Sequence, residues 1–381
     1  MDNLEFAQSV PEETHLAIEG VKHAKDLWLE MLKGAKSTID IGQFYIASIP
    51  GEAMEPVLGL IREKARSGIK VRLVVDRGMI EGGNYELRYF DNIKEIEIRT
   101  IDLKTLTNSI MHAKYMIIDR EDCFLGSQNF DWRSLTQVHE IGVRIKEKKL
   151  GEIMTRIFEN DWEIAKTDKL PVYKKTERGR SPEFTVTYEN EPIKIRPAFS
   201  PAIITPPDLS LELDEVTGLI NSAQREILVS VMEYSPKSSY TKDYLTRIDF
   251  SLREASIKGV QVKLLFTDWV YKEPNISFIK SLAAMPNIEV KASSIPRLEK
   301  KFIPFARVSH CKFMVVDRDK AWLGTTNWEP DYYLSSRNMS VVMEGAATNK
   351  KLRELFFNTW TQPFSEHIDL SRKYIKPQIG D

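Results

Sequence analysis

The chain contains one long motif twice, and this duplication constrains the fold more than any other feature of the sequence. The first copy is HAKYMIIDREDCFLGSQNFDW, beginning at His112, and the second is HCKFMVVDRDKAWLGTTNWEP, beginning at His310. The register between the copies holds without a gap as far as Trp162 and Trp360. Self-similarity over such a span indicates two copies of one structural unit. A chain of 381 residues is long enough to hold both.

Segments upstream of the motifs match as well, with small gaps. STIDIGQFYIAS, from Ser37, parallels REILVSVMEYSP, from Arg225. Apolar runs typical of strands alternate with segments of helical periodicity. The helical segments are 22–34, 54–66, 148–165, 214–224, 244–258 and 348–361. The pattern predicts an α/β fold of two pseudo-twofold related α/β/α sandwich repeats, with mixed, largely buried sheets.

The region between the repeats is rich in proline and charge, which is typical of a linker. We therefore expect a first repeat at 1–170, a linker at 171–200 and a second repeat at 201–381. Residues around 183–196 could add a hairpin to this linker.

Composition restricts the function and the compartment. The net charge is −1, so a nucleic acid or a lipid phosphate would have to meet a local basic pocket and not a generally basic surface. Two cysteines do not make a disulfide scaffold, and CxxC and HExxH zinc patterns are absent. The sequence shows no signal-peptide pattern and no apolar stretch of membrane-spanning length. We expect a cytoplasmic or otherwise soluble protein.

Each motif places a histidine and a lysine on one face. Residues i and i+2 of a strand point the same way, so His112 and Lys114 share a face, and so do His310 and Lys312. If the repeats pair about a pseudo-twofold axis, the two pairs meet in one pocket. Two lysines would hold the anionic oxygens of a phosphodiester, while one histidine attacks phosphorus and the other protonates the leaving oxygen. We expect no cofactor.

The other repeated polar residues divide into two groups. Asp119 and Asp317 follow the histidines at an odd spacing, so we interpret them mainly as structural, with direct contact to substrate as the alternative. The turns GSQN and GTTN could offer hydrogen bonds to phosphate, and the alternative is turn chemistry alone. Their candidate residues are Ser127, Asn129, Thr325 and Asn327.

One position breaks the symmetry between the repeats. Glu140 lies as far beyond His112 as Asn338 lies beyond His310. A carboxylate on one imidazole nitrogen fixes the tautomer and supports developing positive charge. We therefore predict that Glu140 backs His112 as the nucleophile and that His310 is the general acid. The alternative for Glu140 is an ordinary surface charge.

The doubled pattern HxK-x4-D-x6-G[ST]xN resembles the phospholipase D superfamily, the HKD enzymes. The resemblance implies a two-step displacement through a phosphohistidine, without metal. SQNFDWRSLTQVHEIGV, SVMEYSP and IPFARVSHCKFMVVDRDKAWLGTTNW are similar to one branch in particular. That branch contains animal lysosomal phospholipase-D-like 5′ exonucleases and the poxviral nicking-joining nuclease and envelope phospholipase. This chain lacks the animal members' membrane anchor and disulfide cysteines, and it has Glu233 where a neutral polar residue is expected.

Two substrate classes follow from the resemblance: single-stranded nucleic acid cut from the 5′ end, and phospholipid head groups. Aromatic residues beside the motifs favour nucleic acid because bases stack on them, although at least half should belong to the core. Lys300, Lys301 and Arg307 could follow a phosphate backbone, or the lysines could form a solvated charge run. The substrate-binding candidates are Phe44, Tyr45, Tyr234, Arg307 and Trp328. The duplication makes a monomer sufficient for catalysis and leaves a homodimer open.

Overall fold

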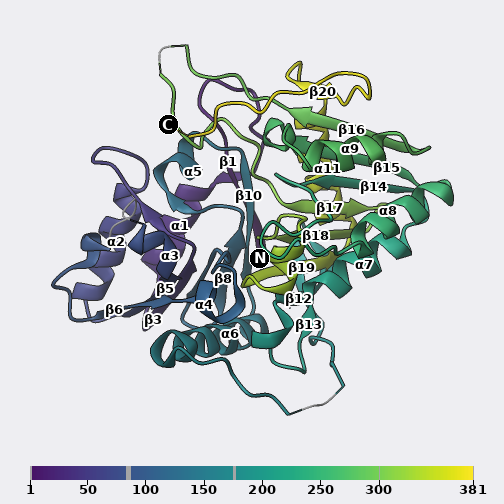
Figure 1. Cartoon of the computed structure of the whole chain (residues 1–381). Helices are drawn as coiled ribbons and strands as arrows, with labels where there is room; N and C mark the ends of the chain where they lie inside the picture. Colours follow the sequence, from purple (N-terminus) through teal and green to yellow (C-terminus); the bar gives the residue numbers. More distant parts are fainter. Residues whose placement is uncertain (1, 83–86, 175–176, 300, 381) are drawn as a thin grey trace.

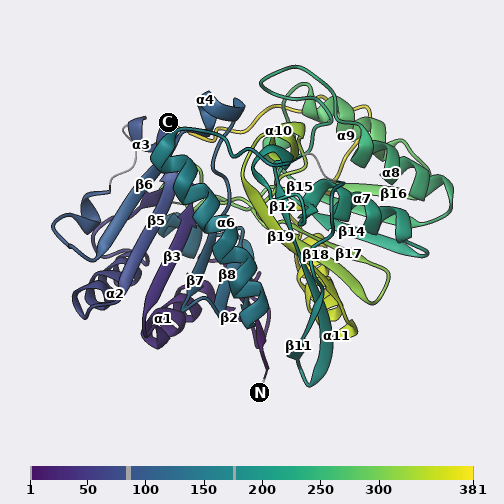
Figure 2. The same cartoon turned by 90° about the horizontal axis from the view of Figure 1, so that it is seen from below.

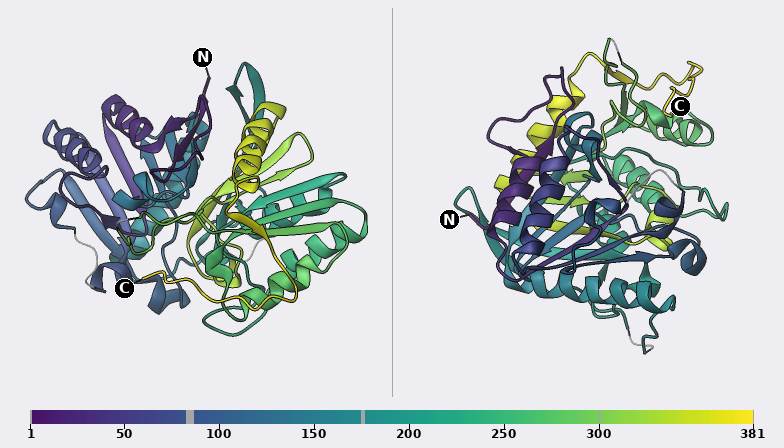
Figure 3. Two further views of the ribbon diagram at one scale, coloured as in Figure 1. Left: turned by 90° about the horizontal axis from the view of Figure 1, so that it is seen from above. Right: turned by 90° about the vertical axis from the view of Figure 1, so that its left-hand side faces the viewer.

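The computed structural model describes residues 2–82, 87–174, 177–299 and 301–380. Two halves, each built on its own large β-sheet, lie side by side, with helices on the faces of the sheets (Figure 1). The two views of Figure 3 show the same pairing from above and from one side. The predicted α/β fold with two related repeats is therefore confirmed.

The first sheet is mixed, with the order β2-β1-β10-β8-β7-β3-β5-β6. Strand β3 pairs in parallel with β5 and antiparallel with β7. The strands are β1 Leu4–Ser9, β2 Lys22–His23, β3 Thr38–Gln43, β5 Lys70–Asp76, β6 Ile96–Ile101, β7 Tyr115–Ile118, β8 Asp122–Gly126 and β10 Glu140–Lys146. A separate small pair joins β4, Ile46–Ala47, to β9, Phe130–Asp131.

The second sheet has the order β11-β12-β19-β18-β17-β14-β15-β16-β20, with β13 beside β12. Its run from β19 to β16 repeats the order of β10 to β6 in the first sheet, as the duplication requires. The strands are β11 Phe184–Tyr188, β12 Glu191–Ser200, β13 Ser210–Leu211, β14 Glu226–Ser230, β15 Gln261–Thr267, β16 Ile288–Ser293, β17 Phe313–Val316, β18 Lys320–Gly324, β19 Asn338–Glu344 and β20 Ser365–His367.

All six predicted helices are present within about three residues at each end. They are α1 Ala24–Gly34, α2 Glu55–Arg66, α6 Lys148–Thr167, α7 Glu212–Ser222, α8 Arg247–Ile257 and α11 Ala346–Trp360. The nine-residue helix α9, Asn275–Ala283, was not predicted, because it is short and begins without a side-chain cap. Short helices complete the set: α3 Arg77–Glu81, α4 Leu103–Thr107, α5 Trp132–Thr136, α10 Pro330–Leu334, and the 3₁₀ turns η1 Arg88–Phe90, η2 Ala202–Ile204 and η3 Asp268–Val270.

The two halves share one apolar core. Buried residues of α6 and β7 in the first half form a single cluster with those of β17 and α11 in the second half. Helices α1 and α2 cover the outer face of the first sheet, and α7 and α8 cover that of the second (Figure 2). Because the interface is continuous with the core, the position of one half relative to the other is fixed by packing.

The hairpin expected near 183–196 forms as β11 and β12, but it is part of the second sheet. Strand β12 pairs with β19 along seven residues from Lys194 to Ser200, and Ile193 and Ile195 are fully buried. In addition, Asn3 N donates to Thr187 O at 2.9 Å, which links the hairpin to the first sheet. The second structural half therefore begins at Phe184 and not at 201. The buried, alternating apolar residues of β12 explain why it joins a sheet.

Candidate active site

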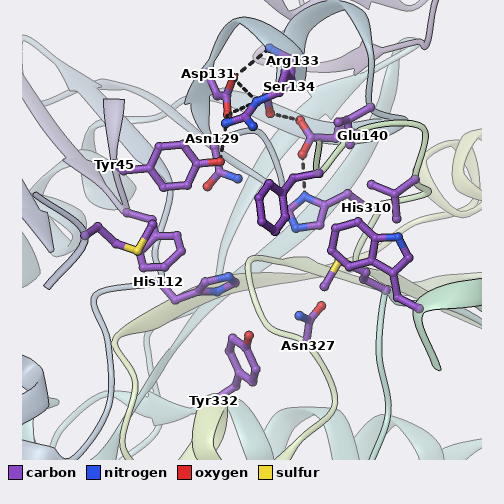
Figure 4. A pocket seen from close by; sticks show the side chains of 17 residues that line it. Tyr45, His112, Asn129, Asp131, Arg133, Ser134, Glu140, His310, Asn327 and Tyr332 are labelled. Atoms are coloured by element: carbon purple, nitrogen blue, oxygen red, sulfur yellow. Dashed lines mark hydrogen bonds and ion pairs between the residues drawn. The ribbon is translucent and has the colours of Figure 1, made fainter. Parts of the chain in front are cut away.

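The two histidines meet at the interface between the halves. Each His-Lys pair lies in extended chain just before a strand, β7 in the first half and β17 in the second, and not inside the strand. His112 N donates to Arg337 O at 3.0 Å, and His310 N donates to His139 O at 2.8 Å. These reciprocal bonds between the halves bring both imidazoles to one pocket of about 350 Å³ (Figure 4).

Each imidazole is held by a side chain from the opposite half. Glu140 Oε1 lies 2.5 Å from Nδ1 of His310, and Asn338 Oδ1 lies 2.9 Å from Nδ1 of His112. The prediction that Glu140 backs His112 is therefore wrong. Glu140 begins β10 directly after His139, and the backbone bond from His310 to His139 places that strand end beside the second motif. Glu140 also accepts a short hydrogen bond from Ser134.

Burial shapes the electrostatics of the site. Burial lowers the pKa of both imidazoles well below the usual value, and the two lysines lower it further. Burial also lowers the pKa of Lys312 to about 7 and that of Lys114 strongly. The pKa of Glu140 is raised to about 8 by burial, against the opposing effect of Ser134 and the lysines. A bound anionic phosphate would favour the charged form of each lysine.

The lysines do not line the pocket as expected. The fully buried Lys114 and Lys312 turn their Nζ atoms toward the backbone carbonyl oxygens of His112 and His310, at 2.5 and 2.8 Å. A charge on either lysine would therefore act on the site through the low-dielectric interior and not by direct contact. Direct polar contacts with a ligand would be made by the residues that line the cavity.

The two motif asparagines face the cavity. Asn129 and Asn327 both line the pocket, and atoms of both carboxamides lack a hydrogen-bond partner among the residues that the structure describes. Ser127 and Thr325 do not reach it. Ser127 Oγ bonds with the backbone of Ile141, and Thr325 Oγ1 donates to Asn338 Oδ1 at 2.8 Å, so Thr325 acts through the partner of His112.

Asp119 and Asp317 lie away from the pocket and bind backbone amides. Asp119 accepts from the backbone N–H groups of Lys36, Ser37 and Thr38 at 2.8–2.9 Å. Asp317 accepts in the same way from Gln224, Arg225 and Glu226. The two aspartates thus connect the end of one strand to the start of another in each half. Neither aspartate lines the pocket, and these contacts favour the structural interpretation.

Some of the aromatic candidates line the pocket and others belong to the core. Phe44 and Tyr45 line the pocket, and the Phe44 ring lies 5.5 Å from the His112 ring. Tyr332 also lines it, and its ring centroid lies 4.7 Å from that of His112. Tyr234 and Trp328, expected to bind substrate, are instead core residues: Tyr234 donates to Asp249, and Trp328 packs against Trp322.

The structure shows other contacts for two of the basic candidates. Arg307 is buried and donates to the carbonyl oxygens of Pro296 and Glu12, both at 2.7 Å, so its predicted substrate role is wrong. Lys301 lies over the ring of Trp132, outside the pocket lining. Lys300 lies outside the described residues. Glu233 forms an ion pair with Lys272.

Sequence reasoning missed much of the pocket wall. Arg133 is held by Asp131 and also donates to Pro304 O at 3.2 Å, so it links the first motif to the loop before the second. Asp131 lies at the end of the first motif and Arg133 directly follows it, so their position in the sequence could have indicated a place in the site. The other unpredicted lining residues are Met79, Ser134, Val138, Met232, Trp269, Phe305 and Val308.

The fold and site define a phosphodiesterase whose two halves share one pair of histidines. The family model described as cardiolipin synthase, PLD-like domain matches residues 28–162 and 216–360. The chain belongs to this phospholipase-D-like family, which confirms the resemblance seen in the motifs.

Similar proteins carry different activity names. A probable phospholipase D of Caenorhabditis elegans is 27% identical over 91% of this chain and 67% of its own length. The human 5′-3′ exonuclease PLD3 is 29% identical over 96% of this chain and 81% of its own length. The crystal structure of a phosphatidylserine synthase from Haemophilus influenzae shares the fold, with a TM-score of 0.61 at 10% identity, covering 92% of this chain and 85% of that one.

Within the described ranges, no helix is long and apolar enough to cross a membrane.

Proposed function

We propose that this phosphodiesterase is metal-independent, works through a phosphohistidine intermediate and digests single-stranded nucleic acid from the 5′ end. One observation carries the chemistry: two imidazoles, each oriented by a side chain from the other half, open onto the same pocket beside two buried lysines. The paired arrangement suits two-step displacement, which needs one nucleophile and one acid. Each chain supplies both, so one copy is sufficient for catalysis.

The position of Glu140 supports an assignment of the two roles. Glu140 supports positive charge on His310, so His310 is the nucleophile and His112 the general acid, the reverse of the assignment from sequence. His310 Nε2 attacks phosphorus and a P–N bond forms. The P–O bond to the leaving group breaks, and His112 gives its proton to that oxygen. Water then attacks the phosphohistidine and passes a proton to His112, and the P–N bond breaks.

The pocket wall supports a nucleic-acid substrate. Five aromatic side chains line it, and aromatic faces bind bases without regard to sequence. They are Phe44, Tyr45, Trp269, Phe305 and Tyr332. The similarity to a protein named as a 5′-3′ exonuclease points the same way.

The second candidate is a phospholipase D or transphosphatidylase that acts on phospholipid head groups. Similarity to a protein named probable phospholipase D favours it. The histidines would do the same chemistry on either substrate, because they act only on the phosphodiester. Substrate choice therefore depends on the rest of the pocket.

A substrate comparison tests the proposal. The protein is incubated, in EDTA, with a 5′-hydroxyl single-stranded DNA oligonucleotide and separately with vesicles of phosphatidylglycerol or phosphatidylcholine. We expect the oligonucleotide to shorten from its 5′ end, and the His112→Ala/His310→Ala double variant to be inactive. An intact oligonucleotide with hydrolysed lipid would support the second candidate. Activity that appears only without EDTA would contradict the metal-independent mechanism.

A further inference from the structure

Part of the pocket wall is apolar. Val138, Met232 and Val308 form a small buried cluster, and Trp269 packs against it. Phe305 supplies a second ring, 6.4 Å from that of Trp269 and inclined to it by 70°. All five line the pocket that contains both imidazoles. The pocket therefore joins a phosphodiester site to an apolar compartment with two flat walls at a steep angle.

Phe305 is presented to this compartment by an unusual backbone. Its side chain is 52% exposed, and its φ of +57° lies in the left-handed region, which a residue with a bulky side chain rarely occupies. Such a conformation persists only where surrounding contacts impose it, and it is frequent at ligand sites. Packing of its ring against Trp269 leaves Phe305 half exposed, at a residue that lines the pocket.

Contacts from several parts of the chain impose this conformation. Phe305 N donates to Ile379 O at 2.8 Å, in the C-terminal segment that returns from β20 toward the first half (Figure 1). Arg133 of the first half donates to Pro304 O. Arg307, two residues later, is anchored on the carbonyl oxygens of Pro296 and Glu12. The ring is thus positioned before any ligand arrives, which reduces the entropy lost on binding.

We infer that Phe305 and Trp269 form the nucleobase-binding subsite of the enzyme, where the base of a nucleotide attached to the scissile phosphate stacks on one ring and meets the edge of the other. The inference rests on the proposed function and adds its recognition element. Flat rings of this kind match a planar base better than a flexible acyl chain, and stacking tolerates any base. In this arrangement Arg307 and Arg133 are positioning residues for the loop.

A double-mutant cycle between ring and base tests this inference. Two oligonucleotides are compared, one normal and one with abasic residues at its two 5′-terminal positions, and kcat/KM is measured for release of the first nucleotide. For the native protein we expect the abasic oligonucleotide to be cut roughly 5- to 150-fold less efficiently, which corresponds to ~1–3 kcal/mol of stacking. For Phe305→Ala we expect a similar loss on the normal oligonucleotide and no further loss on the abasic one.

Two further variants complete the test. Phe305→Trp should restore the preference for a base. Phe250→Ala removes another exposed phenylalanine, on α8 and outside the pocket lining. It should leave kcat/KM unchanged for both oligonucleotides. If Phe305→Ala still cut the abasic oligonucleotide less efficiently than the normal one by the same factor as the native protein, the inference would be overturned, because ring and base would then act independently. Failure to cut either oligonucleotide in the native protein would instead contradict the proposed function.

Discussion

Glu140 in the first half holds His310 in the second half, with Oε1 2.5 Å from Nδ1. The reciprocal position carries an amide, because Asn338 in the second half holds His112 in the first. The side chain that bonds Nδ1 of each histidine thus comes from the other repeat. The active site therefore exists only when both halves are assembled, and the two imidazoles differ in the charge of their partners.

The phosphoenzyme should form on His310. With a nitrophenyl phosphodiester, whose leaving group needs no proton, we expect alkaline quenching, which preserves the acid-labile P–N bond, to trap a phosphoryl group on His112→Ala and none on His310→Ala. The reason is that only the attacking histidine becomes bonded to phosphorus. A phosphoenzyme in His310→Ala and none in His112→Ala would restore the roles expected from sequence.

Replacement of the carboxylate should slow the attack. We expect Glu140→Gln to lower kcat roughly 10²- to 10⁴-fold, because the amide does not support the positive charge that develops on His310. The single-turnover rate of phosphoenzyme formation measures this step directly. Glu152→Gln, at an exposed position on α6, is the matched control and should leave the rate unchanged. A defect confined to dephosphorylation would contradict the assignment of Glu140 to the nucleophile.

Acid should destabilise the fold through His139. Burial lowers the pKa of His139 to about 4, while in the unfolded chain it should be near 6.5. The unfolded state binds more protons between these values, so stability present above pH 6.5 is lost as the pH falls toward 4, on the order of 3 kcal/mol. Urea unfolding across this range should show a weaker pH dependence in His139→Gln. His15→Gln, at an exposed site, should keep the native dependence.

The buried pair Arg337–Asp161 should join the halves. Both side chains are fully buried, and Nη2 of Arg337 lies 2.8 Å from Oδ1 of Asp161. The backbone carbonyl of Arg337 also accepts from His112 N. We expect Asp161→Asn to reduce the free energy of unfolding by about 3–5 kcal/mol, because it leaves a buried charge uncompensated. Asp208→Asn breaks an exposed pair with Arg156 and should cost less than about 1 kcal/mol in the same denaturant titration. Equal effects would contradict the special role of burial.

Asp119 should stabilise the fold without entering the chemistry. Its carboxylate accepts from three consecutive backbone amides, so we expect Asp119→Ala to lower the free energy of unfolding by about 2–3 kcal/mol. Well below the melting temperature, kcat should stay within about threefold of the native value. Asp317→Ala should behave alike. A large loss of kcat in a fully folded variant would show that the aspartate contacts the reaction.

The sequence alone determined what depends on local periodicity and on the internal comparison. The duplication established two equivalent sheets, and the spacing of polar and apolar residues located six helices. The duplication also placed His112 and His310 at corresponding points of the two halves, so a shared site followed from pairing the repeats. These features are encoded within short stretches, or by one stretch repeating another.

Only the tertiary structure decided which residues face each other across the interface. Glu140 supports His310 because strand ends cross between the halves, and no spacing along one repeat reports such a crossing. The same limit applies to the aromatic residues: Trp328 stands beside its motif yet packs in the core, whereas Phe305 is turned into the pocket by contacts from Arg133 and the C-terminal segment. Contact between distant segments depends on how the two halves pack, and that packing is a property of the whole core.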